Sequence, residues 1–199
     1  MTDFTNPTTR TTGHKVTATD WNELVNNNKF FDETRYLELD IAESHPPLSN
    51  TTAAGIELVE SSAGTPTPAW YQASYNGTAV LARQWSKPIP PEYKDSPAIE
   101  FIGYMGTATA GTIVVSAYVS SIGAGASGAA RPFDAANAAT ITVPGTAGIC
   151  FAGTISLTNA DGMAAKDHAV FMLAREGTAT EDTAGGTLKI NSVAFRYGI

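Results

Sequence analysis

The sequence predicts a mainly β protein, an antiparallel β-sandwich of jelly-roll type that follows an extended N-terminal arm and a short helix. From residue 49 onward, short runs of Val, Ile, Tyr, Phe and Thr alternate with clusters of Gly, Pro, Asn and Asp. No repeated helical pattern falls between these runs, which argues against parallel βαβ units. About eight strands joined by long crossing loops suit a jelly roll.

The N-terminal part of the chain predicts an arm and then a helix. Residues 1–18 are rich in Thr and Asn and almost free of apolar side chains, so alone they bury too little surface to fold. Asp20 and Glu23 have the spacing of a capping box, which predicts a helix over residues 20–31. Its apolar face is the expected attachment or oligomer interface, formed by Trp21, Leu24, Val25 and Phe31.

Residues 35–41 end this N-terminal segment. Leu37, Leu39 and Ile41 alternate with acidic residues in the period of a strand, although the tail of the helix is an alternative. Two prolines that follow His45 end either element. We therefore expect two units, an arm with its helix over 1–45 and a β-sandwich over 46–199.

The sandwich is expected to contain nine runs of strand character. These are residues 55–61, 69–75, 78–85, 98–105, 112–120, 139–143, 149–158, 169–175 and 187–197. Asn76 and Gly77 stand between two of these runs and both tolerate positive φ, so they predict a β-hairpin there.

Composition excludes several classes of function. The 199 residues carry a formal charge of −7, so there is no surplus of Lys and Arg to bind nucleic-acid phosphates. The single cysteine, Cys150, excludes an intrachain disulfide and a multi-cysteine zinc site. The start offers no apolar core of a signal peptide, and no stretch reaches the ~20 apolar residues of a membrane helix. We expect a soluble protein made in the cytoplasm, with no nucleic-acid or membrane partner.

The charge pattern indicates self-association. Between Gly103 and Ala165 the only charged residues are Arg131, Asp134 and Asp161. A subunit that packs against copies of itself needs fewer surface charges than a monomer does. A homo-oligomer is therefore expected, and a monomer with a surface of small residues is the alternative.

Motifs that could carry chemistry are weak. Residues 123–128 match the letters of the dinucleotide fingerprint, but Pro132 falls where its helix should run, so a loop is expected. The three histidines lack the spacing of metal ligands, and no serine lies in a G-x-S-x-G motif. Scattered carboxylates leave a glycan hydrolase open only as a third reading. We expect no enzyme, no catalytic residues, no cofactor and no metal.

Aromatic residues offer a binding alternative. Trp70, Tyr71 and Trp85 are the possible ligand-facing aromatics, close to a proline-rich stretch over residues 88–91. If exposed, they would stack on sugar rings, and if buried, they would anchor the core or a subunit interface. Burial is the favoured reading of the cluster.

Two stretches resemble structural proteins of tailed bacteriophages. The segment Gly13-His-Lys-Val16-Thr-Ala-Thr-Asp20-Trp21-Asn22-Glu-Leu24 resembles the start of many phage fibre and decoration subunits. Residues 85–90, 98–105, 111–119, 167–175 and 193–197 are similar to β-sandwich modules of phage virion proteins. The resemblance covers most of the chain and carries no catalytic motif.

This resemblance implies a virion structural protein, a capsid decoration or tail-fibre-like subunit assembled in the host cytoplasm. It implies a homotrimer whose arm docks on the major capsid protein or on tail or neck subunits, while the sandwich faces outward. The alternative is a receptor-binding or carbohydrate-binding tail module that contacts a host surface glycan.

Overall fold

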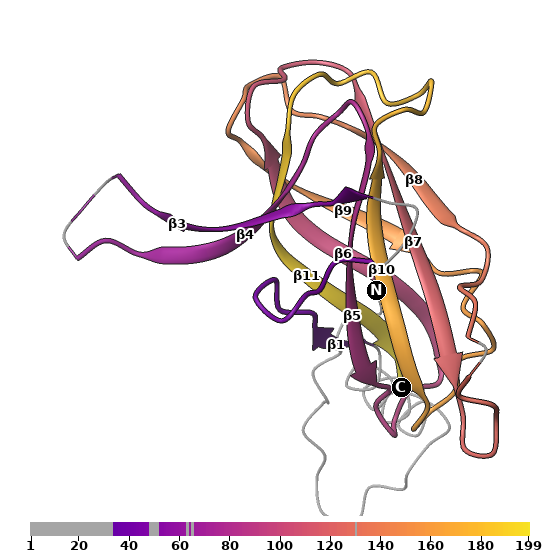
Figure 1. Ribbon diagram of the computed structural model, residues 1–199. Helices are drawn as coiled ribbons and strands as arrows, with labels where there is room; N and C mark the ends of the chain where they lie inside the picture. The colour runs from indigo at the N-terminus through magenta and orange to yellow at the C-terminus, as the bar shows by residue number, and fades with distance from the viewer. Residues whose placement is uncertain (1–33, 48–51, 63, 65, 130) are drawn as a thin grey trace, which may run out of the picture.

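The computed structural model describes residues 34–47, 52–62, 64, 66–129 and 131–199, which form two β-sheets packed face to face (Figure 1). Sheet A contains β1 (Arg35–Glu38), β3 (Gly55–Glu60), β4 (Ala69–Tyr75), β6 (Asp95–Met105), β9 (Cys150–Ser156) and β11 (Leu188–Gly198). Sheet B contains β2 (Thr52–Ala53), β5 (Val80–Pro88), β7 (Thr112–Ile122), β8 (Asn137–Thr142) and β10 (His168–Glu176). Within these ranges there is no α-helix, and hence none that could cross a membrane.

The strand order is that of a jelly roll. Sheet A runs β3-β4-β11-β6-β9 with β1 also beside β11, and sheet B runs β2-β5-β10-β7-β8. From β4 to β11, every connection except β7 to β8 passes from one sheet to the other. All pairings are antiparallel apart from the short β2–β5 pair. The predicted antiparallel two-sheet sandwich is confirmed, whereas the arm and the helix with Trp21, Leu24, Val25 and Phe31 lie outside the described residues.

The hairpin predicted at Asn76 and Gly77 is wrong, although a turn does form there. β4 lies in sheet A and β5 in sheet B, so the turn joins two sheets instead of two paired strands. The Asn76 side chain accepts a hydrogen bond from the Thr78 amide at 3.1 Å. A Cβ at Gly77 would lie 2.8 Å from Nη2 of Arg175, so glycine is required by this close approach.

Residues 35–41 form a strand and its extension, not the tail of a helix. β1 pairs with the C-terminal half of β11, from Arg35 opposite Tyr197 to Glu38 opposite Ala194. Leu39 and Ile41 follow, and both are buried in the core between the sheets. This part of the segment 1–45 therefore packs as part of the sandwich, which begins no later than Arg35.

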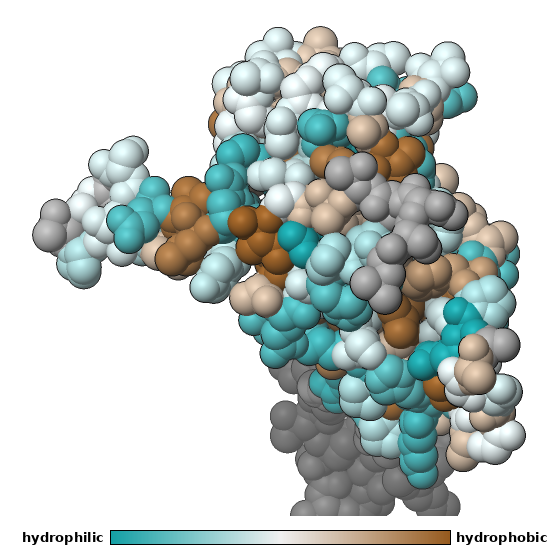
Figure 2. All heavy atoms as spheres, viewed as in Figure 1, coloured by the Kyte–Doolittle hydropathy of each residue, from teal (hydrophilic) through white to brown (hydrophobic). Residues whose placement is uncertain are grey.

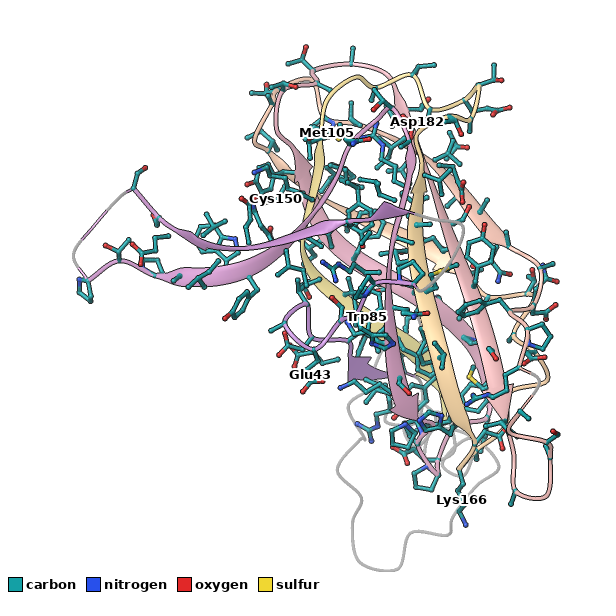
Figure 3. All side chains as sticks on the ribbon, in the orientation of Figure 1. Glu43, Trp85, Met105, Cys150, Lys166 and Asp182 are labelled. Carbon is teal, nitrogen blue, oxygen red and sulfur yellow. The ribbon has the colours of Figure 1, made fainter. Side chains whose placement is uncertain are left out.

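A buried ion pair closes one end of the sandwich. Arg175 at the end of β10 contacts Asp182 with Nε and Nη2, at 2.9 and 2.7 Å, and both side chains are fully buried. Arg175 also donates to the carbonyls of Ala184 and Gly186 at 2.6 and 2.7 Å. In Figure 3, Asp182 lies at the end of the sandwich opposite Lys166. The pair therefore holds the 177–187 connection against the core.

The hairpin formed by β3 and β4 projects from the body of the sandwich (Figure 1). Leu58 and Tyr71 face each other across it and are 58% and 47% exposed. Figure 2 shows apolar side chains gathered along this hairpin. A two-stranded ribbon standing alone is marginally stable in water, so the base of this one depends on its junction with β11.

Candidate functional site

The outer face of sheet A, the side turned away from sheet B, has a regular pattern of side chains. Along β6 and β11 the buried residues alternate with outward residues, as the pleat requires. Residues opposite each other in antiparallel strands point to the same side, which places Ile102 beside Ser192 and Glu100 beside Ala194. Ala152 on β9 extends the first of these rows, because it lies opposite Ile102.

A hollow of about 250 Å³ lies at the centre of this face. Ala152, Ser192 and Ala194 line it from two strands, and their small side chains leave the space open. Tyr36 of β1 and Ile102 of β6 line the same hollow and are 59% and 50% exposed. Two large apolar side chains held in water over a concave floor are typical of a binding surface.

An ion pair lies at one side of the hollow. Arg196 and Glu100 are 2.9 Å apart, and each side chain is about one-third exposed. Beyond Arg196 a second, open hollow of about 380 Å³ includes Ser96, Ser156 and Thr158. The two depressions therefore meet at a charged pair with oxygen and nitrogen atoms that can still contact a ligand.

A network of polar side chains lies at the other side of the face. Tyr104 donates a hydrogen bond to Oε1 of Gln72 at 3.0 Å, and Gln72 in turn donates to Glu57. Lys189 and Ser74 also donate to Glu57, at 2.9 and 3.1 Å. These donors, the Lys189 ammonium first, lower the pKa of Glu57 from 4.5 to about 2. The network is thus fixed in one protonation state at neutral pH.

Charged side chains of the face are held in ion pairs. In the described part of the chain, Arg196 is paired with Glu100 and Lys189 with Glu57 on this face. A glycoside hydrolase needs a carboxyl group whose pKa is raised so that it can donate a proton. The pKa of Glu57 shifts in the opposite direction. Across the described ranges, no group of three or more His, Cys, Asp or Glu side chains is placed to hold a metal ion.

Of the three aromatic residues singled out from the sequence, Trp70 and Tyr71 are consecutive on β4, whereas Trp85 lies on β5 in the other sheet. Trp85 is 1% exposed and donates its indole N–H to the Asp40 carbonyl at 2.7 Å, so burial, the favoured reading, holds for Trp85 and the alternative that it faces a ligand is wrong. Figure 3 places it within the sandwich. Its inward position on β5 follows from the pleat, which turns it toward the core. Trp70 is half-buried on β4, and Tyr71 is exposed on the projecting hairpin.

The loop expected at residues 123–128 is confirmed. Residues 123–128 lie in the connection between β7 and β8, outside any helix. Asp161 and Asp167 accept hydrogen bonds from the backbone amides of Ser121 and Ala164, at 2.7 and 2.8 Å. These carboxylates therefore organise the loops, as capping side chains do.

The central residues of the face were missed by the sequence analysis. Tyr36, Ile102 and Ser192 come from strands far apart in the chain and become neighbours only through the jelly-roll order. Small residues at outward positions, such as Ala152 and Ala194, were the available signal. That signal is readable only when the partner strands are known.

No family model matches the sequence, and no curated protein matches it. Among solved structures, the chain resembles a family 11 carbohydrate-binding module from Clostridium thermocellum in complex with a β-1,3-1,4-mixed-linked tetrasaccharide. The TM-score is 0.45 at 13% identity, over 82% of this chain and 95% of the module. A xylan-binding module gives 0.43 at 14% identity, over 82% and 97%.

A third module, specific for non-crystalline cellulose, gives a TM-score of 0.40 at 11% identity, over 71% of this chain and 82% of the module. Because all three scores are below 0.5, the ligands of those modules do not bear on the ligand of this chain. These comparisons also give no support to the virion role that the phage resemblance implies.

Proposed function

We propose that this chain binds a neutral glycan on the outer face of sheet A and does not catalyse a reaction there. The observation that carries the proposal is the central hollow, in which a floor of small side chains lies beside exposed Tyr36 and Ile102. Jelly rolls serve both as capsid domains and as lectins, so the fold leaves the function open and the site decides it.

The face matches the chemistry of a sugar. A pyranose ring has apolar C–H faces, which pack on Tyr36 and Ile102, and a rim of hydroxyl groups that need hydrogen-bond partners. Glu100 and Arg196 supply an acceptor and donors at the edge of the hollow. Their mutual ion pair holds both side chains in place, so less side-chain entropy is lost when the ligand binds.

The charges favour a neutral ligand over an anionic one. Glu57 and Glu100 are matched by Lys189 and Arg196, so neither cation is left unpaired on this part of the face. Glu38 is outward-facing and adds a negative charge beside Ala194. A sulfated or carboxylated glycan would meet this acid, while the cations described on this part of the face, Lys189 and Arg196, are already paired.

A glycan array followed by calorimetry tests the proposal. The wild-type chain is expected to bind at least one neutral glycan, and Tyr36→Ala should weaken binding at least tenfold. Ala194→Trp, which fills the hollow, should abolish it. Ile149→Ala, which truncates an exposed apolar side chain outside the hollow, is the matched control and should bind as the wild type does. Absence of any array signal, or full binding by Ala194→Trp, contradicts the proposal.

A second candidate function is that of a subunit in a larger assembly, and the projecting hairpin favours it. Leu58 and Tyr71 are large, apolar and exposed on the hairpin, where contact with a neighbouring subunit would cover them. The phage resemblance implies a homotrimer on a virion, as a capsid decoration or tail-fibre-like subunit. A glycan-binding tail module would combine both candidates.

Light scattering behind size exclusion tests this second candidate. The wild type is expected to run as a trimer, and Leu58→Asp should shift it toward the monomer because a buried, unpaired charge opposes association. A wild-type monomer at micromolar concentration contradicts the candidate and leaves the glycan proposal unaffected.

A further inference from the structure

A smaller recess lies beside the central hollow, between the two strands, β4 and β1, that pair with successive parts of β11. β11 pairs with β4 over Leu188–Ile190 and with β1 over Ala194–Tyr197. Between these stretches its register against β6 shifts at Asn191, which is the mark of a β-bulge. The gap left in the sheet is a recess of about 130 Å³.

The recess adjoins the central hollow. Ser192 lines both, so a ligand in the hollow has the recess directly beside it. At about 130 Å³ the recess is half the size of the central hollow, so it suits a substituent of the sugar whose ring the hollow holds.

Two polar atoms of residues that line the recess lack hydrogen-bond partners in the described part of the chain. They are the indole Nε1 of Trp70, a donor, and the amide Oδ1 of Asn191, an acceptor, and each atom exposes less than 1 Å² of surface, so a ligand contacts them once the two side chains turn toward the recess. A buried polar atom without a partner is destabilising. A ligand group that both accepts and donates would complete this pair.

The remaining lining is apolar on one side and acidic on the other. Leu39, Ile41 and Val193 are buried side chains of the core that reach the recess. Asp40 also lines it, and its Oδ1 already accepts a hydrogen bond from the Ala42 amide at 2.9 Å. The combination disfavours an anion and favours a neutral group with a methyl end.

We propose that this recess binds the acetamido group of an N-acetylhexosamine whose ring lies in the central hollow. Its carbonyl accepts from Trp70 Nε1, its N–H donates to Asn191 Oδ1, and its methyl group packs on Leu39 and Val193. This inference rests on the proposed glycan function and specifies the class of sugar.

Two tetrasaccharides that differ only at C2 test it. Chitotetraose carries an acetamido group on each ring where cellotetraose carries a hydroxyl group, in the same β-1,4 linkage. Calorimetry is expected to show that the wild type binds chitotetraose at least tenfold more tightly. Trp70→Phe and Asn191→Ala should each reduce that ratio to below threefold, whereas Ile149→Ala, at an exposed residue outside the hollow and the recess, should preserve it.

The outcomes separate this inference from the proposal on which it rests. Equal binding of the two sugars by the wild type, or no binding of chitotetraose while other array glycans bind, overturns the inference alone. Absence of binding to every glycan overturns the proposed function as well. Because the wild-type comparison is decisive by itself, it stands even where a variant fails to fold.

Discussion

Tyr104 donates its hydroxyl hydrogen bond to Gln72 at 3.0 Å, and this bond spans β11 to join β6 to β4. Gln72 is fully buried although it is on the outer face. Its amide has a partner at each end, since Oε1 accepts from Tyr104 and Nε2 donates to Glu57. The bond therefore links the hollow-bearing centre of sheet A to the base of the projecting hairpin.

Tyr104→Phe is expected to lower the free energy of unfolding by about 1–3 kcal/mol. The substitution leaves Oε1 of the buried Gln72 without its donor, and an unsatisfied buried acceptor costs this amount. Urea denaturation measures the change. An unchanged midpoint would show that water replaces the tyrosine hydroxyl and that the network is dispensable for stability.

Stability should fall with acid in a window set by Glu57. Its pKa is lowered from 4.5 to about 2 on folding, so the unfolded chain binds the proton more tightly. The contribution is fully present above about pH 4.5 and is lost as the pH falls toward 2. Thermal unfolding of Glu57→Gln should show a shallower decline over this window than the wild type, and parallel curves would contradict the assignment.

Asp182→Asn should destabilise the fold by about 3–5 kcal/mol, because it leaves the fully buried Arg175 guanidinium without its counter-charge. Lys87→Met is the matched control. Lys87 pairs with Glu43 at the surface, where an ion pair contributes at most about 1 kcal/mol. Comparable losses in the two variants, measured by urea denaturation, would contradict the structural role given to Arg175.

Tyr75→Phe should stabilise the protein by about 1 kcal/mol or more. Tyr75 is completely buried, and its hydroxyl has no hydrogen-bond partner in the described part of the chain. Burial raises the pKa of this hydroxyl well above its usual value, so it remains neutral at any accessible pH. A higher thermal midpoint is the expected result, and a lower one would reveal a partner for the hydroxyl group.

The positions of the long strands could be predicted from the sequence, whereas the pairing of the strands in the sheets could not. Alternation and turn residues marked each long strand, because both are local properties of the chain. The turn at Asn76 and Gly77 was also local, but which strands it joins depends on packing against Arg175, about one hundred residues away. The hairpin prediction failed for this reason.

The candidate site depends on such distant neighbours. Trp85 is a large aromatic residue that could have faced a ligand, but its position on β5 points its side chain into the core. Ser192 and Ala194 are unremarkable in sequence, and they matter because Ile102 and Tyr36 stand beside them. Such a hollow leaves no motif in the sequence. It forms where small side chains of one strand lie among larger side chains of other strands, and the sequence alone does not show which strands are neighbours.

The location of the bound glycan tests the central claim most directly. Amide chemical shifts of the isotopically labelled chain would be followed while the tightest-binding glycan of the array is added. Shifts concentrated at Ile102, Ala152, Ser192 and Ala194 are the predicted result. Shifts confined to the outer side of sheet B or to the tip of the β3–β4 hairpin would contradict the assignment of the outer face of sheet A as the binding site.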